Sequence, residues 1–281
     1  MKQIARQARA EGSSVGLVPT MGALHEGHMS LVRAAQAECR PVVVSIFVNP
    51  AQFAPHEDFQ KYPRPLEQDR RRLEEAGVEY LFVPEAGEMY PPGFRTWVNV
   101  EGLSDRLEGR VRPGHFRGVV TVVLKLLEIV QPQKAFFGRK DAQQARLVQQ
   151  MARDLNLYSE IVVSPIVREQ DGLAISSRNV YLSPEERSAA TVLQRALVGA
   201  RRAIEQGERD ALRLIAAIRK VLASEPLAQP DYVEIVDAET LEPLTRVRGR
   251  CLALVAARLG KAHLIDNLLI EEREGHVRTE L

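Results

Sequence analysis

The chain has 281 residues, 45% of them hydrophobic and 27% charged, and its 38 basic residues nearly balance 37 acidic ones. This composition is typical of a globular protein with one large or two modest cores, and it excludes disordered and fibrous proteins. A net charge of +1 provides no overall field to attract a polyanion, so we expect no nucleic-acid partner.

Apolar segments and cysteines indicate the compartment. The sequence has no run of 18 apolar residues, and its amphipathic start lacks the apolar core of a signal peptide. Cys39 and Cys251 do not form a Cys-x-x-Cys pair, so both are expected to be buried free thiols. We therefore expect a cytoplasmic protein without a membrane partner.

Strand-like runs alternate with helical patterns up to residue 166. The run at 41–48 is apolar at nearly every position, which is typical of a central parallel strand covered on both faces. This half is predicted to be a doubly wound, Rossmann-like α/β domain. The predicted strands are 14–18, 41–48, 79–83, 134–137 and 160–166, and the predicted helices are 28–39, 65–76, 118–131 and 141–155.

The pattern changes near Val167, so we place a domain boundary there and expect domains at 1–166 and 167–281. Two consecutive amphipathic helices are followed by three strand-like runs, which predicts a smaller C-terminal α+β domain. The helices are expected at 184–206 and 209–224, and the strands at 231–236, 250–257 and 263–270.

Two histidines follow the first strand. His25 and His28 flank Gly27, where a helix is expected to begin and to present free N–H groups and its positive dipole end to an anion. Two other interpretations are a plain turn with exposed histidines and a zinc site. The zinc site is disfavoured because the second histidine comes one residue too early for the His-Glu-x-x-His helix.

Further polar residues follow other strands. Ligands of doubly wound sheets bind beyond the carboxyl ends of the strands, so these clusters are expected to form one site. Lys140 suits a phosphate, whereas Asp141 suits a helix cap or a ribose. The residues in this group are Gln52, Gly138, Lys140, Asp141 and Gln144.

Two polar segments leave alternatives open. The loop with Ser176, Ser177 and Arg178 offers hydroxyl, guanidinium and backbone donors to a phosphate, but it is equally compatible with a solvated turn. The segment from Arg112 to Arg117 is interpreted as a solvated helix entry rather than an anion cradle. Neither a P-loop nor a Gly-x-Gly-x-x-Gly fingerprint occurs, so a nucleotide site must be built in another way.

Four sequence motifs contain most of these polar residues. They are Pro19-Thr-Met-Gly-Ala-Leu-His-Glu-Gly-His28, Val44-Ser-Ile-Phe-Val-Asn-Pro-Ala-Gln-Phe53, Phe136-Phe-Gly-Arg-Lys-Asp-Ala-Gln-Gln144 and Asp171-Gly-Leu-Ala-Ile-Ser-Ser-Arg-Asn179. In register, the four motifs closely resemble those of the pantoate-β-alanine ligases, or pantothenate synthetases. The similarity covers residues 14–182 and weakens after that.

The resemblance implies a nucleotidyltransferase with a class I aminoacyl-tRNA-synthetase-like core. Such an enzyme joins pantoate and ATP into pantoyl adenylate and pyrophosphate, and β-alanine then converts the adenylate into pantothenate and AMP. It also implies Mg²⁺ beside the phosphates and a homodimer. We further expect the C-terminal domain to close over ATP, with the loop at 167–179 as hinge and lid, because closure would exclude water from the labile adenylate.

Site residues carried over from the family fall into three groups. Those expected in catalysis are His25, His28, Lys140, Ser176, Ser177 and Arg178. All six are expected at the ATP phosphates, and ATP is also expected to contact Pro19, Met21, Gly138, Asp141 and Val167. Pantoate is assigned to Gln52 and Gln144.

The chain departs from the family pattern at several positions. Arg139 stands where the family usually has glutamate, and Ala142 where it usually has an aromatic residue. Gln68 and Asp69 stand where the family has an acidic pair associated with magnesium, which makes Asp69 the single magnesium candidate.

Four rival functions rank below the ligase. The two neutral amides at Gln52 and Gln144 and the lack of a base-reading motif disfavour an adenylyltransferase with a stable nucleotide product. A tRNA synthetase would need a basic anticodon domain. Retention of the full donor set disfavours a non-catalytic binding protein, and the histidine spacing disfavours a metallohydrolase.

Overall fold

The computed structural model describes residues 1–55, 57–273 and 276–281, and divides the chain into two compact units. Unit 1 comprises Met1–Arg139 and Gln143–Ser164, and unit 2 comprises Lys140–Ala142 and Pro165–Leu281. In the described ranges, the helices are all too short or too polar to cross a membrane.

Unit 1 is built on a parallel sheet with the order β3-β2-β1-β4-β5. Successive strands are added on one side of β1 up to β3 and then on its other side from β4 onward. Doubly wound sheets bind their ligands at such a switch point, here between β1 and β4. The predicted doubly wound fold is therefore confirmed. The strands are β1 (Gly16–Thr20), β2 (Val42–Ile46), β3 (Tyr80–Phe82), β4 (Lys134–Gly138) and β5 (Glu160–Ser164).

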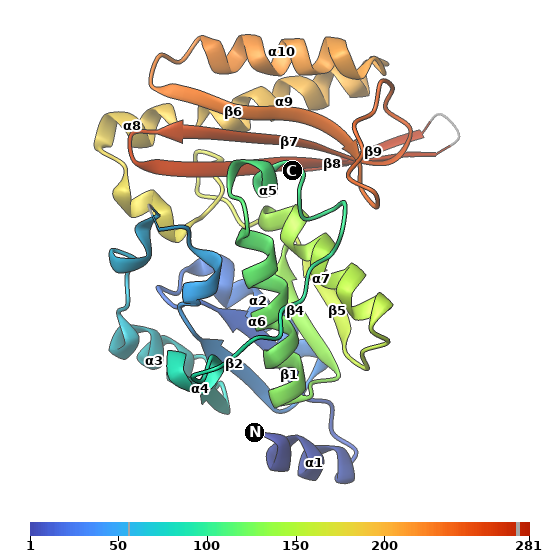
Figure 1. The fold of residues 1–281 in the computed structure, drawn as a ribbon. Helices are drawn as coiled ribbons and strands as arrows, with labels where there is room; N and C mark the ends of the chain where they lie inside the picture. The colour runs from blue at the N-terminus through green and yellow to red at the C-terminus, as the bar shows by residue number, and fades with distance from the viewer. Residues whose placement is uncertain (56, 274–275) are drawn as a thin grey trace. The chain divides into compact units, whose positions relative to one another are not determined.

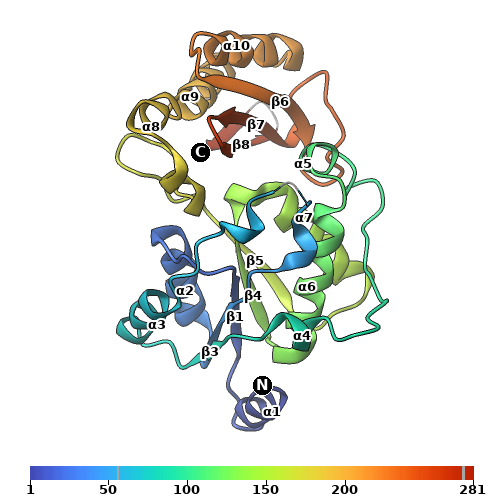
Figure 2. The same ribbon diagram turned by 60° about the vertical axis from the view of Figure 1, so that its left-hand side comes forward.

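Helices cover both faces of this sheet (Figure 2). Side chains alternate along β1, so Leu17 packs with helices α1, α6 and α7, while Val18 packs with α2 and α3. Burial on both faces explains the continuous apolar run of β2, whose five residues are all buried. The helices are α1 (Lys2–Ala10), α2 (Glu26–Glu38), α3 (Leu66–Glu75), α6 (His115–Val130) and α7 (Ala142–Asp154).

Short helices connect these elements. They include η1, which follows β2, and η3, which leads from β4 into α7. Their bounds are η1 (Pro50–Gln52), η2 (Asp58–Gln60), α4 (Ala86–Met89), α5 (Glu108–Val111) and η3 (Arg139–Asp141).

Unit 2 contains an antiparallel sheet of order β6-β7-β8-β9, with α9 and α10 along one face (Figure 1). The core lies between this face and the two helices, and its largest side chains include Leu197, Ile218 and Ile235. The elements are η4 (Ser177–Tyr181), α8 (Pro184–Ala189), α9 (Val192–Glu205), α10 (Ala211–Ala223), β6 (Ala228–Asp237), β7 (Gly249–Leu259), β8 (Ala262–Arg273) and β9 (His276–Glu280).

The structure corrects several predicted elements. The helix expected at 184–206 is split into α8 and α9, because bonds from Thr191 N to Ser188 O and from Leu193 N to Ala190 O follow the tighter i to i+3 pattern. The sequence pattern missed α1 and β9. The expectation of two buried free thiols, Cys39 and Cys251, is confirmed.

Candidate active site

The loop that carries His25 and His28, called the histidine loop below, follows β1. Helix α2 begins at Glu26, one residue before the predicted start at Gly27. His25 is the N-cap of α2, and the two histidines form a reciprocal cap in which the backbone N–H of His25 donates to His28 Nδ1 at 3.3 Å. Their rings stack with centroids 4.0 Å apart. A Cβ on Gly27 would lie 3.0 Å from the His25 ring, so glycine leaves room for it. Both histidines are half-buried, unlike those of a solvated turn.

Asp69 of α3 holds this loop. Its two carboxylate oxygens accept the backbone N–H groups of Ala23 and Leu24, each at 2.8 Å, and the residue is 2% exposed. Gly22 and Ala23 both have positive φ, at 80° and 51°. Two successive left-handed residues persist only where the surroundings fix them, and Asp69 supplies that restraint.

Gln52 ends η1 after β2 and is buried. Its Oε1 accepts from Asn49 Nδ2 at 3.0 Å, which turns Nε2 toward Met21 Sδ, 3.2 Å away. Asn49 is itself fixed, because its Oδ1 accepts from Tyr90 OH at 2.8 Å and its Nδ2 donates to Gly118 O at 3.1 Å. The amide of Gln52 is therefore held in one orientation.

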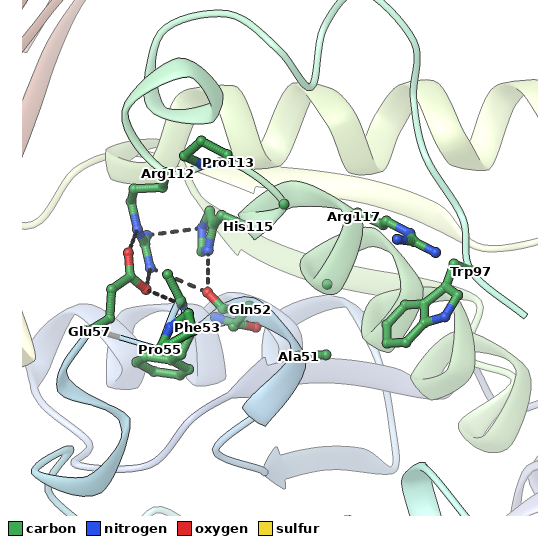
Figure 3. A pocket seen from close by; sticks show the side chains of 13 residues that line it. Ala51, Gln52, Phe53, Pro55, Glu57, Trp97, Arg112, Pro113, His115 and Arg117 are labelled. Carbon is green, nitrogen blue, oxygen red and sulfur yellow. Dashed lines mark hydrogen bonds and ion pairs between the residues drawn. The ribbon is translucent and has the colours of Figure 1, made fainter. Parts of the chain in front are cut away.

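The backbone of Gln52 is held from the other side by residues of a pocket of about 280 Å³ (Figure 3). His115 Nδ1 donates to Gln52 O at 2.8 Å, while Arg112 makes two hydrogen bonds to Glu57, at 2.7 and 2.9 Å. Burial, and then the neighbouring Arg112, lower the pKa of His115 to about 4. His115 is therefore a neutral donor at pH 7.

The predicted solvated helix entry is thus wrong for Arg112. Its side chain is only 14% exposed and pairs with Glu57, a residue far away in sequence that local charge patterning could not reveal. Arg117 is exposed, and its guanidinium lies over the ring of Trp97 at 4.8 Å from the centroid.

Unit 2 carries the second group of predicted residues. Lys140 lies in η3, with its Nζ 3.8 Å from Asp141 Oδ1. Ser176 is the N-cap of η4, and its Oγ accepts the backbone N–H of Arg178 at 3.2 Å. This turn displays Ser177 and Arg178, both half-buried.

The remaining predicted residues are also half-buried. Pro19 lies in β1 and Met21 follows it, Gly138 ends β4, Gln144 lies in the first turn of α7, and Val167 accepts the backbone N–H of Ile175 at 3.0 Å. In unit 1, the contact between Met21 and Gln52 brings a predicted ATP residue next to a predicted pantoate residue.

A magnesium ion does not fit Asp69 well as a direct ligand. Both of its oxygens already accept short backbone hydrogen bonds in a buried setting. Among the described residues, no group of three or more His, Cys, Asp or Glu side chains is placed to hold a metal ion. The assignment of magnesium to Asp69 stays an untested prediction, and the geometry favours a role in holding the loop.

These residues offer imidazole, ammonium, guanidinium, hydroxyl and amide groups at the carboxyl ends of strands or on capped turns. A family model described as pantoate-beta-alanine ligase matches residues 1–269. The chain belongs to this family. Both the predicted resemblance and the predicted class, a ligase that forms an amide bond, are confirmed.

Curated relatives extend over almost the whole chain. The pantothenate synthetase of Heliobacterium modesticaldum is 56% identical over 266 residues, covering 95% of each chain. That of Acidobacterium capsulatum is 58% identical over 259 residues, covering 92% of this chain and 87% of the relative.

Solved structures agree with these relatives. Pantothenate synthetase from Thermus thermophilus is 51% identical, with a TM-score of 0.89 over 94% of this chain and 96% of that one. The pantoate-beta-alanine ligase of Francisella tularensis, complexed with beta-gamma ATP and beta-alanine, is 34% identical, with a TM-score of 0.76 over 95% and 94% of the two chains.

The sequence interpretation missed several residues that hold the predicted ones. Asn49, Tyr90 and His115 fix Gln52, and Asp69, which the sequence suggested only for magnesium, fixes the histidine loop. Asn49 lies in one of the quoted motifs, so its position was visible, but its buried contact with Tyr90 joins segments 41 residues apart.

Proposed function

We propose that this chain condenses pantoate with β-alanine at the expense of ATP, through a pantoyl adenylate. Membership in the ligase family carries this proposal, and the Francisella relative bound to an ATP analogue and β-alanine supports it. Pantoate would be activated first, because a free carboxylate does not react with an amine in water.

In the first step, a pantoate carboxylate oxygen attacks the α-phosphorus of ATP, and the bond to pyrophosphate breaks. The attacking group is already ionised, so no strong base is needed. Catalysis then consists of positioning the reactants and stabilising charge on the phosphoryl oxygens and pyrophosphate. In the second step, the β-alanine amine attacks the acyl carbon, and AMP leaves with the oxygen that came from pantoate.

We assign the phosphates to the donors His25, His28, Lys140, Ser176, Ser177 and Arg178. Supporting this, His28 Nδ1 already accepts a backbone N–H, so its other ring nitrogen carries the proton and can donate. The nucleoside is assigned to Pro19, Met21, Gly138 and Val167, and its ribose to Asp141.

We assign pantoate to Gln52 and Gln144. The geometry at Gln52 supports this, because Asn49 holds the amide oxygen and one amide N–H faces Met21 Sδ, so the second N–H can donate to a substrate oxygen. A donor held in place suits both the hydroxyl and carboxylate groups of pantoate.

Mg²⁺ is proposed to enter with the ATP phosphates and to neutralise their charge. Mg²⁺ normally keeps several waters and binds few protein ligands when a polyphosphate is present. This description requires no direct contact from Asp69.

We also propose that the protein is a cytoplasmic homodimer and that unit 2 of each chain acts as a lid.

The fate of one oxygen tests the adenylate route. With pantoate labelled by ¹⁸O in the carboxylate, the AMP released in the complete reaction is expected to contain one ¹⁸O atom. Mass spectrometry of AMP and pyrophosphate measures this directly. Label in inorganic phosphate or in pyrophosphate, with none in AMP, would contradict attack at the α-phosphorus.

A further inference from the structure

Two neighbouring residues in the middle of β8, Asp266 and Asn267, are buried polar residues without a role so far. They are 3% and 0% exposed, and they pair in the ladder with Val255 and Leu254 of β7. Buried polar groups in a strand are costly unless hydrogen bonds compensate them, so their partners are informative.

Asp266 anchors the loop that leads to Ser176. Its two oxygens receive Arg168 Nη1 and Nη2 at 2.7 and 2.9 Å, and Arg168 Nη1 also donates to Gly172 O at 3.0 Å. Arg168 forms an isolated β-bridge with Ala174, two residues before Ser176. A bidentate pair fixes a guanidinium in both position and plane.

The far end of the same loop is tied down as well. Asn179 Nδ2 donates to Glu169 Oε1 at 3.1 Å and to Ala174 O at 3.2 Å. Arg187 of α8 pairs with Glu169 at 2.7 Å. The helical turn η4, which displays Ser177 and Arg178, lies against β8.

Asn267 holds the other loop. Its Nδ2 donates to the backbone carbonyl of Lys140 at 3.1 Å, and its own N–H donates to Asp266 Oδ1 at 2.7 Å. The loop with Lys140 and the loop with Ser176, Ser177 and Arg178 are therefore fastened to adjacent residues of one strand. Side chains of consecutive strand residues point to opposite faces of a sheet, so β8 holds the two loops from its two faces, at a spacing that its backbone fixes.

We propose that Asp266 and Asn267 are positioning residues that set the spacing of the two phosphate-binding loops of unit 2 for adenylate formation. The inference rests on the proposed function, because it assumes that both loops contact ATP. Neither residue needs to touch the substrate. Displacing a reacting group by about 1 Å costs on the order of 10²-fold in rate, so loss of either attachment to β8 is expected to slow turnover.

Continuous pyrophosphate release at saturating β-alanine tests this, with ATP and pantoate varied separately in Asn267→Ala and Asp266→Asn. We expect kcat/KM for ATP to fall about 10²-fold in Asn267→Ala, with KM for pantoate within twofold of the parent. Asp231→Asn is the matched control, since Asp231 forms ion pairs with Arg258 and His263 of the same sheet.

Circular dichroism and thermal unfolding separate positioning from loss of fold. If Asp266→Asn fails to fold, Asn267→Ala carries the test, because it removes the side-chain bond to the carbonyl of Lys140 without removing a charge. A folded Asn267→Ala variant with kcat/KM for ATP within threefold of the parent overturns the inference. A parental rate in Lys140→Ala would instead overturn the proposed role of Lys140 and the inference with it.

Discussion

The stacked pair of His25 and His28 combines two tasks. The pair caps α2 and also presents ring nitrogens at the start of a 13-residue helix, where N–H groups and the dipole favour an anion. A polar side chain that is both cap and donor is held in place by the backbone it caps. Such preorganised donors are the most effective at stabilising charge in a transition state.

The first prediction concerns His25→Ala. Removing one preorganised donor costs roughly 3 to 4 kcal/mol of transition-state stabilisation, so adenylate formation should slow by about 10²- to 10³-fold. Losing an N-cap should lower the free energy of unfolding by only about 1 kcal/mol. Single-turnover pyrophosphate release and urea unfolding measure the two effects. Near-normal turnover would reject the assignment of His25 to the phosphates.

The second prediction concerns His115, whose pKa is lowered from 6.5 to about 4. The unfolded chain binds this proton at a higher pH than the folded one, so the free energy of unfolding falls as pH drops from 6.5 to 4. The loss is about 3 kcal/mol for such a shift. Between these limits, His115→Gln should show a flatter dependence of stability on pH.

Urea unfolding at pH 7 and pH 4.5 measures this effect. His276→Gln, at an exposed position of β9, is the control and should keep the parental dependence. An unchanged dependence in His115→Gln would show that the fold does not hold this histidine neutral.

At the scale of elements, the close approach of α6 to η1 presents Gln52. A Cβ on Gly118 would lie 2.2 Å from Ala51 O and 2.8 Å from Gln52 Cα, so only glycine fits there. The carbonyl of Gly118 also accepts a bond from Asn49. The helix therefore fixes the turn through its backbone, a feature that hydrophobic periodicity does not encode.

The third prediction compares Gly118→Ala with Gly199→Ala. Overpacking against backbone costs about 1 to 3 kcal/mol, and Gly118→Ala should also raise KM for pantoate by displacing Gln52. Gly199 lies exposed inside α9, and a Cβ there would meet no described atom within 4 Å. Gly199→Ala should therefore stabilise the protein by about 0.5 to 1 kcal/mol without changing KM. Equal effects of the two substitutions on KM would contradict the role of Gly118.

The fourth prediction separates loop holding from metal binding at Asp69. Asp69→Asn replaces one acceptor with a donor that faces a backbone N–H, so adenylate formation should slow by about 10- to 100-fold. The Mg²⁺ concentration for half-maximal rate should stay parental. Glu67→Gln, on the exposed side of α3, is the control. A large rise in the Mg²⁺ requirement of Asp69→Asn would restore Asp69 as a metal ligand.

Individual residues show which parts of the fold and the site could be predicted from the sequence. The apolar run of β2 and the periodic helices predicted the sheet, because burial of both faces leaves a direct trace in hydrophobicity. The split between α8 and α9 left no such trace, since Ala190 and Thr191 are compatible with a continuous helix. The motifs located His25, Gln52 and Lys140. The residues that hold them in place could not be predicted, because their contacts join distant segments, as in the bond from Asn267 to the carbonyl of Lys140.

At the scale of the whole molecule, the proposed phosphate donors are distributed over two units, with His25 in unit 1 and Lys140 in unit 2. The adenylate is labile in water, so a site that closes during the reaction would protect it. We therefore predict that the radius of gyration falls when ATP and pantoate bind together. Small-angle X-ray scattering, with ATP alone as control, measures this. An unchanged radius would favour a rigid site.

We propose that this ligase works in two separable steps. The most direct measurement is pyrophosphate release from MgATP with pantoate alone, followed by addition of β-alanine. We predict a small release that is stoichiometric with the enzyme and that becomes continuous once β-alanine is present. Release that does not depend on pantoate, or no release until β-alanine is added, would contradict the adenylate mechanism.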